Sequence, residues 1–390
     1  MIAFGRGNVS ACEEQDMTSL QKRTAETPRA QRTLQTNQVW MHGAAGGCVT
    51  RYRIRRCERC ASAVTYPFRS GLMLAIIIVS WNVRTLLDRC IATVQASLAD
   101  SGIDYRIMVV DNASTDGTTV LLRTRYPGVE VIEAGRNLGF AGGNNLALRR
   151  LFARNDWNAC YVLLLNPDTE VIGDALPQMV RYLETHPEVA VVGPRLRYPD
   201  GTVQSSRRRF PTPGVFFWES TPLEWRWSDN PWVRYYRCTD LPDNREQAVD
   251  WLVGAALMVR RSAIERAGLL DAGFLLYSEE LEWQQRLRAY GRITYLPTAE
   301  IVHHEGRSSE QIPTKRLILF HRSRLRYARM RYGDRLAEAV RMFLLAAYTA
   351  ELMIESGKWL LGHRRDLRAR RVAACFALLR ALSRPGNEVW

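Results

Sequence analysis

Strand patterns alternate with helix patterns from Leu74 onward, and this alternation restricts the possible fold more than any other feature. Residues 74–79 form an uninterrupted apolar run dominated by β-branched side chains, which is typical of a strand buried in a parallel sheet. Three further strand-like runs follow, separated by helical spacing or turn residues, at 105–110, 129–133 and 161–165. Such alternation favours right-handed βαβ units. We therefore predict an α/β fold with a doubly wound sheet flanked by helices.

Small polar and acidic residues directly follow these strand runs. They are Ser80 with Asn82, Asp111, Asn137 with Gly139, and Asn166 with Asp168. Sheets of this kind bind ligands beyond the carboxyl ends of their strands. For any one of these ends the pattern favours an ordinary turn, but all of them together predict a ligand site. In such a site a carboxylate can accept hydrogen bonds from a base or ribose, and glycine at a helix start allows phosphate to approach.

Asp168 is the candidate metal ligand. It follows residues 163–165, which are all leucine, so its carboxylate is expected to emerge at the ligand-binding edge. A divalent cation that bridges a diphosphate stabilises the charge of that leaving group, and hard cations prefer carboxylate oxygen. The alternative interpretation is that Asp168 caps a helix over residues 171–182.

Carboxylates and imidazoles recur later in the chain. Glu279 and Glu280 open a predicted helix, where negative charge suits the helix dipole whatever its further role. The functional interpretation is that one of them is the general base that activates a sugar hydroxyl. His303 and His304 follow an apolar pair at another predicted strand end, where a structural role and contact with metal or phosphate are equally expected.

The two ends of the chain differ from this central region. Residues 1–72 are rich in Arg, Thr, Gln and Ser without apolar periodicity, so we predict a disordered or non-native leader and a native start at Met73. Residues 310–390 are predicted to be helical, with apolar stretches beside the arginines of 364–371. They are expected to contact an anionic membrane surface, the catalytic domain or a second copy in a homodimer.

The composition indicates the cellular setting. A formal net charge of +14 suits anionic partners such as nucleotides or an acidic membrane, although a generally Arg-rich composition explains it equally well. The eight cysteines are scattered rather than arranged as a disulfide framework, which favours a reducing cytoplasm. No apolar run reaches the length of about 20 residues needed to span a bilayer.

Several motifs recur in a fixed order along the central region: residues 78–82, 109–117, 137–145, 164–169, 200–204, 250–255, 277–280 and 303–304. As a set they resemble family 2 glycosyltransferases, and in particular the rhamnosyltransferase-like branch of bacterial cell-surface polysaccharide synthesis. The resemblance implies a GT-A catalytic domain over residues 73–309, with a Rossmann-like mixed sheet. It also implies a helical C-terminal extension over residues 310–390.

The resemblance also implies a role for each residue of the nucleotide pocket. Ser80, Asn82 and Asp111 would lie near the base and ribose of a nucleotide-diphosphate sugar. Asn137 and Gly139 would lie close by.

For the reacting groups, the resemblance places Asn166 and Asp168 at the family's Asp-X-Asp metal motif. One carboxylate would then anchor Mg²⁺ or Mn²⁺, and His303 would contact the metal or the diphosphate. Glu280 would be the general base beside Glu279. The implied reaction is direct displacement with inversion at the anomeric carbon.

These expectations define a predicted activity. We predict a glycosyltransferase that moves a sugar, with rhamnose from deoxythymidine-diphosphate rhamnose as the best candidate, to a saccharide or lipid-linked saccharide. It would act in the cytoplasm at the inner face of the membrane, without a nucleic-acid partner. A nucleotidyltransferase is disfavoured because no basic Gly-rich loop follows the first strand. A non-catalytic nucleotide-sugar-binding scaffold is disfavoured because Asp111, Asp168, Glu280 and His303 are all present.

Acceptor selection is expected in residues 200–250. This region contains four tryptophans, Trp218, Trp225, Trp227 and Trp232. Aromatic faces stack on sugar rings, but core packing explains each tryptophan equally well.

Overall fold

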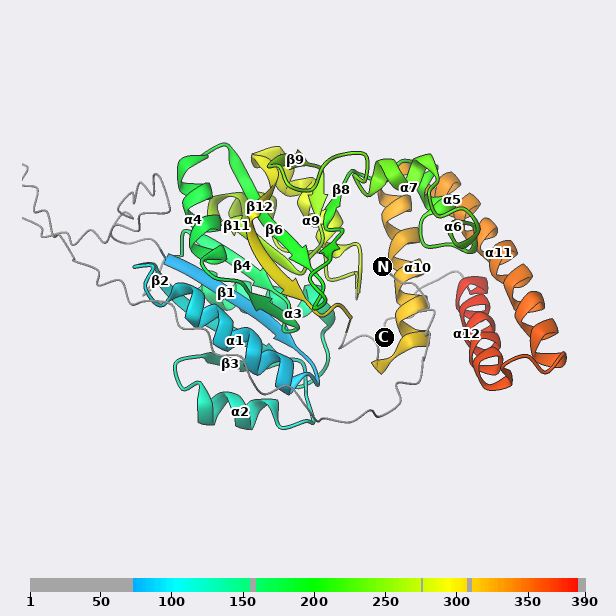
Figure 1. Ribbon diagram of the computed structural model, residues 1–390, viewed down its shortest axis with the longest axis horizontal. Coiled ribbons are helices and arrows are strands. Elements are labelled where there is room, and N and C mark those ends of the chain that lie inside the picture. The colour runs from blue at the N-terminus through cyan, green and yellow to red at the C-terminus, as the bar shows by residue number, and fades with distance from the viewer. Residues whose placement is uncertain (1–72, 155–158, 275, 307–310, 385–390) are drawn as a thin grey trace, which may run out of the picture. The chain divides into compact units, whose positions relative to one another are not determined.

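A central mixed sheet organises the described part of the chain (Figure 1). The structure is a computed structural model that describes residues 73–384 except 155–158, 275 and 307–310, and not the side chain of Trp225. The predicted leader over residues 1–72 lies outside the described residues. The main path of the sheet runs in the order β3 (Glu130–Glu133), β2 (Asp104–Asp111), β1 (Met73–Ser80), β4 (Tyr161–Leu165), β11 (Ala256–Arg260), β6 (Val189–Arg197), β12 (Arg292–His303) and β5 (Thr169–Val171).

Four shorter strands complete the β structure of the described residues. β7 (Val203–Gln204) pairs with β6, and β9 (Gln247–Val249) pairs with β12. β8 (Arg207–Arg208) and β10 (Trp251–Leu252) form a separate two-stranded sheet. The predicted strand runs all become strands, and Ile76 of β1 lies in register between Ile107 of β2 and Leu163 of β4.

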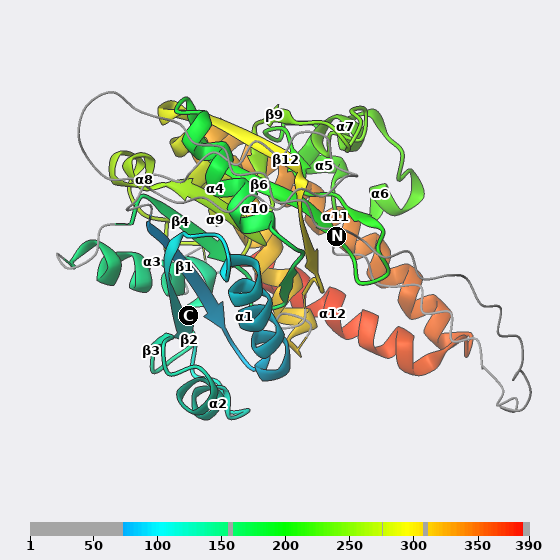
Figure 2. The same cartoon turned by 60° about the vertical axis from the view of Figure 1, so that its left-hand side comes forward.

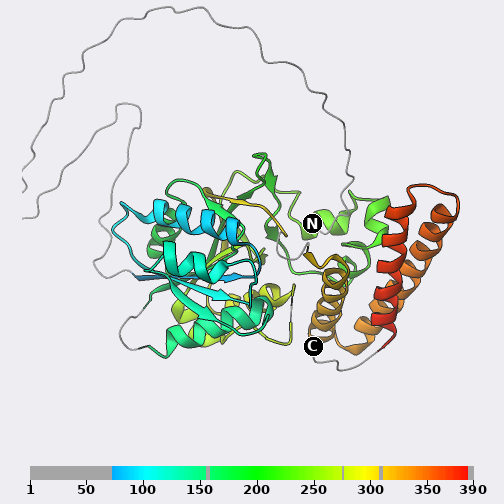
Figure 3. The ribbon, with the colours of Figure 1, turned by 90° about the horizontal axis from the view of Figure 1, so that it is seen from below.

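Helices cover both faces of the sheet (Figures 2 and 3). Successive side chains of a strand point to opposite faces, so Ile76 and Ile77 of β1 enter different apolar clusters. The first cluster includes residues of α1 (Arg84–Leu98) and α4 (Ala175–Thr185). The second includes residues of α3 (Gly139–Phe152), α8 (Arg261–Ala267) and α9 (Glu279–Leu287). The shorter α2 (Thr118–Arg125) and the 3₁₀ turn η1 (Arg288–Tyr290) connect these elements. The predicted α/β architecture is confirmed.

One alternative from the sequence is wrong. Asp168 was expected either to bind metal or to cap a helix over residues 171–182. Residues 169–171 instead form the short strand β5, and α4 begins only at Ala175, with Asp174 in the N-cap position. Since no helix starts at Asp168, capping does not explain its position.

The direction of β11 positions the site. The strands from β3 to β4 run parallel, whereas β11 is antiparallel to both β4 and β6. The carboxyl end of β4 therefore meets the amino end of β11. The backbone N–H of Asn166 donates to the carbonyl oxygen of Ala255 over 2.9 Å. This pairing brings residues 250–255 to the strand end that carries Asp168.

The C-terminal helices pack against the rest of the described chain. α10 (Pro313–Tyr332), α11 (Asp334–Leu360) and α12 (Arg365–Ser383) contribute to a third apolar cluster. That cluster also contains Phe216 of α5 (Val215–Trp218), Tyr236 of α7 (Pro231–Tyr236), Trp251 of β10 and Leu281 of α9. The small α6 (Pro222–Arg226) lies between α5 and α7 in sequence. None of the helices in the described ranges is both long and apolar enough to cross a membrane.

Candidate functional site

Ser80 and Asp111 are neighbours at the ends of β1 and β2. They are paired in register, and both side chains are buried. The carboxylate of Asp111 accepts a hydrogen bond from the backbone N–H of Ser114, at 3.2 Å and 3.3 Å for its two oxygens. The Ser80 hydroxyl has no hydrogen-bond partner among the described residues. A buried hydroxyl without a partner is costly, so this one is suited to bonding with a ligand.

Asn82 shapes the loop that follows β2. Its backbone is left-handed, with φ of 52°. Its backbone N–H donates to the Ser114 hydroxyl over 3.0 Å, and its side-chain oxygen accepts from the N–H of Thr115 over 2.8 Å. The side-chain oxygen of Asn82, which was expected near the base and ribose, thus bonds to the loop that follows β2. Asn82 holds the 112–116 loop beside Asp111.

Asn137 and Gly139 form the turn into α3. The side-chain oxygen of Asn137 accepts from the N–H of Gly139 over 2.9 Å, and Gly139 has a φ of 71° that favours glycine. Asn112, which the sequence reasoning did not select, donates from its side chain to the Gly139 carbonyl over 3.2 Å. A Cβ at Gly143 would lie 2.7 Å from a methyl group of Val79, so this glycine allows α3 to pack on β1.

Asp168 and His303 form a buried pair. Asp168 is 4% exposed, and its Oδ1 atom lies 3.4 Å from Nε2 of His303. The side-chain nitrogen of Asn166 lies 3.4 Å from the same Nε2. β12 pairs with β5 immediately after Asp168, and Thr169 is opposite His303 in this pairing. Three of the predicted residues thus converge at one point, at the ends of β4 and β12.

The second ring nitrogen of His303 has a fixed partner. Nδ1 lies 2.9 Å from the side-chain oxygen of Gln204, while the Gln204 amide nitrogen donates to Glu305 over 2.8 Å. A carboxylate accepts hydrogen bonds, so the Gln204 amide nitrogen faces Glu305, and the Gln204 oxygen accepts a hydrogen bond from the Nδ1–H group of His303. This arrangement leaves a lone pair on Nε2, directed toward Asp168. It is the tautomer that a metal-binding histidine needs.

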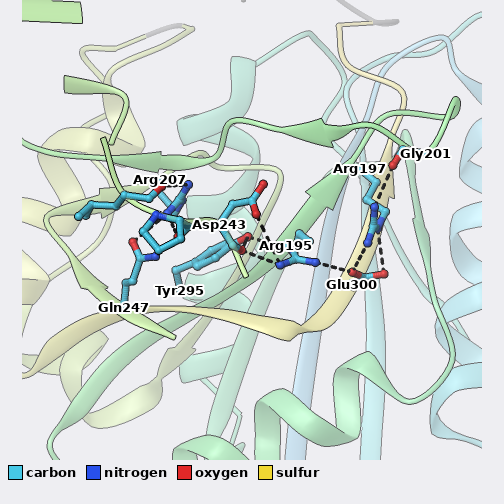
Figure 4. A network of polar contacts seen from close by, with 10 residues as sticks. Arg195, Arg197, Gly201, Arg207, Asp243, Gln247, Tyr295 and Glu300 are labelled. Carbon is cyan, nitrogen blue, oxygen red and sulfur yellow. Dashed lines mark hydrogen bonds and ion pairs between the residues drawn. The ribbon is translucent and has the colours of Figure 1, made fainter. Parts of the chain in front are cut away.

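A charged network fixes the strands that carry Gln204 and His303 (Figure 4). Glu300 of β12 accepts two hydrogen bonds from Arg197 of β6, over 2.6 Å and 2.9 Å. Arg197 also donates to the carbonyl oxygen of Gly201 over 2.8 Å, which holds the turn between β6 and β7. Arg195 also donates to Oε1 of Glu300, over 3.3 Å. The network therefore sets the position of Gln204 relative to β12.

The donor set around Asp168 is suited to a divalent cation that a substrate helps to hold. The set comprises one carboxylate and one imidazole nitrogen, and no group of three or more His, Cys, Asp or Glu side chains able to hold a metal exists among the described residues. Mg²⁺ is commonly bound by one or two carboxylates together with substrate phosphates. The thiol of Cys90 lies nearby, where it bonds to the carbonyl oxygen of Asn166, and burial raises the pKa of this thiol to about 12.

His304 turns away from this point. Its Nε2 atom lies 2.8 Å from a carboxylate oxygen of Glu170. Its backbone N–H donates to the carbonyl oxygen of Asp168 over 2.9 Å. The imidazole of His304 therefore supports β5, while His303 faces the candidate metal site.

Glu279 and Glu280 begin α9 after a sharp turn. Tyr277 and Ser278 both have positive φ, 69° and 67°, which directs the first turn of the helix inward. Each glutamate has a buried carboxylate oxygen that no hydrogen bond satisfies within the described residues. Burial raises the pKa of Glu280, and burial together with the nearby Glu280 charge raises the pKa of Glu279 well above its usual range. Such raised values are typical of groups that exchange protons during a reaction.

Gly254 lies between Glu280 and the candidate metal site. A Cβ on Gly254 would lie 3.4 Å from Cγ of Glu280 and 3.5 Å from the ring of Phe140 in α3. Gly254 is adjacent to Ala255, whose carbonyl oxygen accepts from the N–H of Asn166. The helix start at Phe140, the base candidate Glu280 and the strand end beside Asn166 therefore surround one short segment. As whole residues, Glu280 is half-buried and Glu279 is buried, and each has a buried carboxylate oxygen.

Gln284 holds α9 in this position. It is fully buried, and its side chain forms two hydrogen bonds with the backbone of Leu252, receiving one from the N–H over 2.9 Å and donating one to the carbonyl over 2.7 Å. Gln284 lies one helical turn after Glu280, so this amide fixes the carboxylate against residues 252–254. The sequence contains no local signal for this contact, because it joins segments that are 32 residues apart.

Helix α10 supports the turn before Glu279. Arg316 donates to the hydroxyl of Tyr277 over 2.6 Å, and the Ser323 hydroxyl donates to the carbonyl oxygen of Leu276 over 2.8 Å. The C-terminal extension thus contacts the segment that carries the candidate base.

The tryptophans of residues 200–250 form an aromatic group. Trp218 and Trp232 stack with their ring centroids 5.5 Å apart, and Trp227 lies perpendicular to both. Trp227 and Trp232 remain exposed. The rings pack on one another and also present accessible faces, so core packing and stacking on a sugar ring both remain predictions for these tryptophans.

Several known proteins are similar to this chain. Residues 75–268 match the family described as Glycosyl transferase family 2. The chain is 31% identical over 259 residues to the N-acetylglucosaminyl-diphospho-decaprenol L-rhamnosyltransferase of Mycobacterium tuberculosis, covering 64% of this chain and 82% of that protein. It is 26% identical over 257 residues to Rhamnosyltransferase WbbL of Escherichia coli, covering 60% and 86%. The mannosyltransferase of Pyrobaculum calidifontis, solved with GDP-Man and Mn²⁺, aligns with a TM-score of 0.44 and 17% identity over 78% of this chain and 86% of that one.

Proposed function

The chain belongs to glycosyl transferase family 2, and we propose that it transfers rhamnose from deoxythymidine-diphosphate rhamnose to a lipid-linked saccharide. Its activity as a glycosyltransferase follows from the family and from its rhamnosyltransferase relatives. The donor, the acceptor and the residue roles are the proposal. The observation that carries it is the buried Asp168–His303 pair, joined through residues 254–255 to Glu280.

The nucleoside of the donor would bind at the ends of β1 and β2. The unsatisfied hydroxyl of Ser80 and the carboxylate of Asp111 supply one donor and several acceptors for base and ribose. Asn82, Asn137 and Gly139 would shape the surrounding loops, as their backbone contacts indicate.

The diphosphate would bind where Asp168, His303 and Asn166 meet. Mg²⁺ or Mn²⁺, held there by Asp168 and His303, would neutralise charge on the leaving diphosphate. Asn166 lies within hydrogen-bonding distance of His303 and would keep its ring in place. Gln204 would keep Nε2 unprotonated and available.

Glu280 would act as the general base. Its carboxylate would remove the proton from the acceptor hydroxyl as that oxygen attacks the anomeric carbon of the donor sugar. The bond between the anomeric carbon and the diphosphate oxygen breaks in the same step, and the diphosphate leaves with the bonding electrons. Attack from the opposite face inverts the configuration. Glu279, more deeply buried and with the more strongly raised pKa, would stay protonated beside it.

The names of two relatives support the choice of sugar and acceptor. Both are rhamnosyltransferases, and the mycobacterial protein is named for an acceptor carried on decaprenol diphosphate. An acceptor of this kind lies in a membrane, so we propose that the chain works in the cytoplasm at the inner membrane surface. A homodimer remains the alternative use of the C-terminal helices.

A panel of nucleotide sugars tests this proposal. With Mg²⁺ or Mn²⁺ present, deoxythymidine-diphosphate rhamnose should give the fastest release of nucleoside diphosphate. Asp168→Asn should slow that release on the order of 100-fold to 1,000-fold, because one stabilising contact to the leaving group is lost. Asp174→Asn, at an exposed position outside the site, is the matched control. If none of the donors releases nucleoside diphosphate, and Asp168→Asn therefore changes nothing, a non-catalytic nucleotide-sugar-binding scaffold is favoured.

A further inference from the structure

The turn between α11 and α12 exposes a group of large apolar side chains. We call residues 359–367 the hairpin tip. Its exposed apolar members are Trp359 at 43%, Leu360 at 70%, Leu361 at 86% and Leu367 at 37%. Single exposed leucines are common, but an aromatic residue and three leucines within nine positions form a patch of the kind that marks an interaction surface.

The hairpin tip is held in a defined conformation. Directly below it, the buried carboxylate of Glu355 accepts hydrogen bonds from Arg368, over 2.6 Å and 2.8 Å, and from Lys358 over 3.1 Å. Within the turn, the N–H of Leu361 donates to the carbonyl of Gly357, and the N–H of Gly362 donates to that of Trp359, each over 3.0 Å. Gly362 has a φ of 81°, which suits glycine. The apolar side chains are therefore presented by a braced turn.

Positive charge surrounds this apolar group. Between residues 356 and 372 there is a single acidic residue, Asp366. The Lys and Arg residues of the same stretch are Lys358, Arg364, Arg365, Arg368, Arg370 and Arg371. Arg364, Arg365 and Arg370 are exposed. Arginine binds phosphate groups through its planar set of N–H donors.

We propose that the hairpin tip inserts into the surface layer of an anionic lipid membrane. Tryptophan favours the boundary between headgroups and acyl chains, and leucine favours the acyl side of that boundary. The surrounding arginines would bind lipid phosphates, an attraction that acts over about 8 Å to 10 Å in physiological salt. Insertion of a turn requires no membrane-spanning helix. The functional reason for this membrane contact depends on the proposed lipid-linked acceptor. Membrane binding itself can be measured independently of sugar transfer.

A second copy of the chain fits the hairpin tip less well. A symmetric dimer through this surface would bring the same arginines from both copies together. The centres of protein interfaces are depleted in charged residues, because like charges at short distance repel. Lipid phosphates instead supply the opposite charge at high density.

Sedimentation of the full chain with lipid vesicles tests the proposal. We expect binding to vesicles of phosphatidylcholine with phosphatidylglycerol, much weaker binding to phosphatidylcholine alone, and loss of binding as salt is raised. The double variant Leu360→Ser with Leu361→Ser should weaken binding on the order of tenfold or more, because exposed apolar surface no longer enters the membrane. Val120→Ser, at a position of α2 that is 64% exposed, should bind like the unchanged chain.

A charge variant and a mass measurement complete the test. Arg364→Gln with Arg365→Gln should weaken binding to the anionic vesicles only, whereas Arg149→Gln with Arg335→Gln, at two exposed positions elsewhere, should have little effect. The proposal is overturned if the leucine variant binds vesicles like the unchanged chain. It is also overturned if that variant turns a dimer into a monomer in vesicle-free solution, measured by light scattering. Donor cleavage in detergent should be unaffected by these variants, so failure of the catalytic proposal remains distinguishable.

Discussion

At the scale of single residues, the proposed chemistry depends on two carboxylates, those of Asp168 and Glu280. They come from segments more than 100 residues apart in sequence, and residues 254–255 lie beside Glu280 and bond to Asn166. Their surroundings differ. Asp168 faces an imidazole nitrogen that can share a cation. Glu280 has a carboxylate oxygen without a hydrogen-bond partner among the described residues, and its pKa is raised by burial.

Glu280→Gln should slow transfer on the order of 100-fold to 10,000-fold while leaving donor binding unchanged, because it removes only the proton acceptor. A base must be deprotonated to act. Since burial raises the pKa of Glu280, the rate of the unchanged enzyme should increase with pH through that raised value. The measurement is the pH profile of kcat. An unaltered acid limb in Glu280→Gln would assign the base to another group.

Gln204→Ala should weaken the response to metal. Without the Gln204 oxygen, Nδ1 of His303 loses the partner that fixes its tautomer, and such losses typically cost 10-fold to 100-fold in metal affinity. The measurement is the Mn²⁺ concentration that gives half-maximal donor cleavage. Gln178→Ala on α4 is the matched control, since that side chain contacts only Asp174 of its own helix among the described contacts. An unchanged Mn²⁺ requirement would count against a ligand role for His303.

Residue types alone predicted only part of this site. Asp168, the Glu279–Glu280 pair and the His303–His304 pair stand out as acids or imidazoles at strand or helix ends, and the family resemblance singles out Glu280 and His303 within the two pairs. Gln204 and Gln284 were missed, because an amide carries no charge and their partners lie 99 and 32 residues away. Contacts of this kind depend on the tertiary fold and leave no local pattern.

The paired elements explain why some boundaries were predicted well and others were not. The apolar run of β1 identifies a buried strand by itself, because each of its two faces must be covered. The insertion of β11 between β4 and β6 follows from pairing across about 95 residues, which no local pattern encodes. The helix expected at residue 171 was placed too early for a similar reason. Residues 169–171 become a strand only because β12 pairs with them.

The contact between α10 and α11 should make the protein sensitive to acid. His321 of α10 is fully buried, and its Nε2 atom lies 2.9 Å from the hydroxyl of Tyr348 in α11. Burial, helped by the nearby Arg324 charge, lowers the pKa of His321 to about 3. In the unfolded chain the pKa is near 6.5. The neutral ring therefore stabilises the fold above pH 6.5, and this contribution is lost as pH falls toward 3.

Replacing this imidazole tests the effect. His321→Gln should reduce the loss of the free energy of unfolding between pH 6 and pH 4, by on the order of 1 to 3 kcal/mol. His363→Gln, at an exposed position, should leave the acid dependence unchanged. Denaturant unfolding at several pH values provides the measurement. Equal acid dependence in both variants would show that another group controls it.

At the scale of the whole molecule, the C-terminal helices and the catalytic region share one apolar cluster. Leu344 and Tyr348 of α11 and Leu378 of α12 belong to the cluster that includes Leu281 of α9. Their removal would leave that surface in water. A chain that ends at Gly333 should therefore aggregate and melt at least about 5 °C lower. The double variant Leu360→Ser with Leu361→Ser should keep its melting temperature, because both side chains are exposed. An unchanged melting temperature in the shortened chain would mean that the helices add little to stability.

The antiparallel strand β11 also affects how the protein can assemble on the ribosome. β1 to β4 are complete by residue 165, but β4 gains its second neighbour only when residues 256–260 have been made. At ordinary rates of synthesis, about 5 to 20 residues per second, the β4 edge stays unpaired for several seconds. An open edge of consecutive leucines can pair with other chains. Yield in the cell should therefore depend on chaperones that act before β11 emerges, and slower translation between β4 and β11 should increase aggregation.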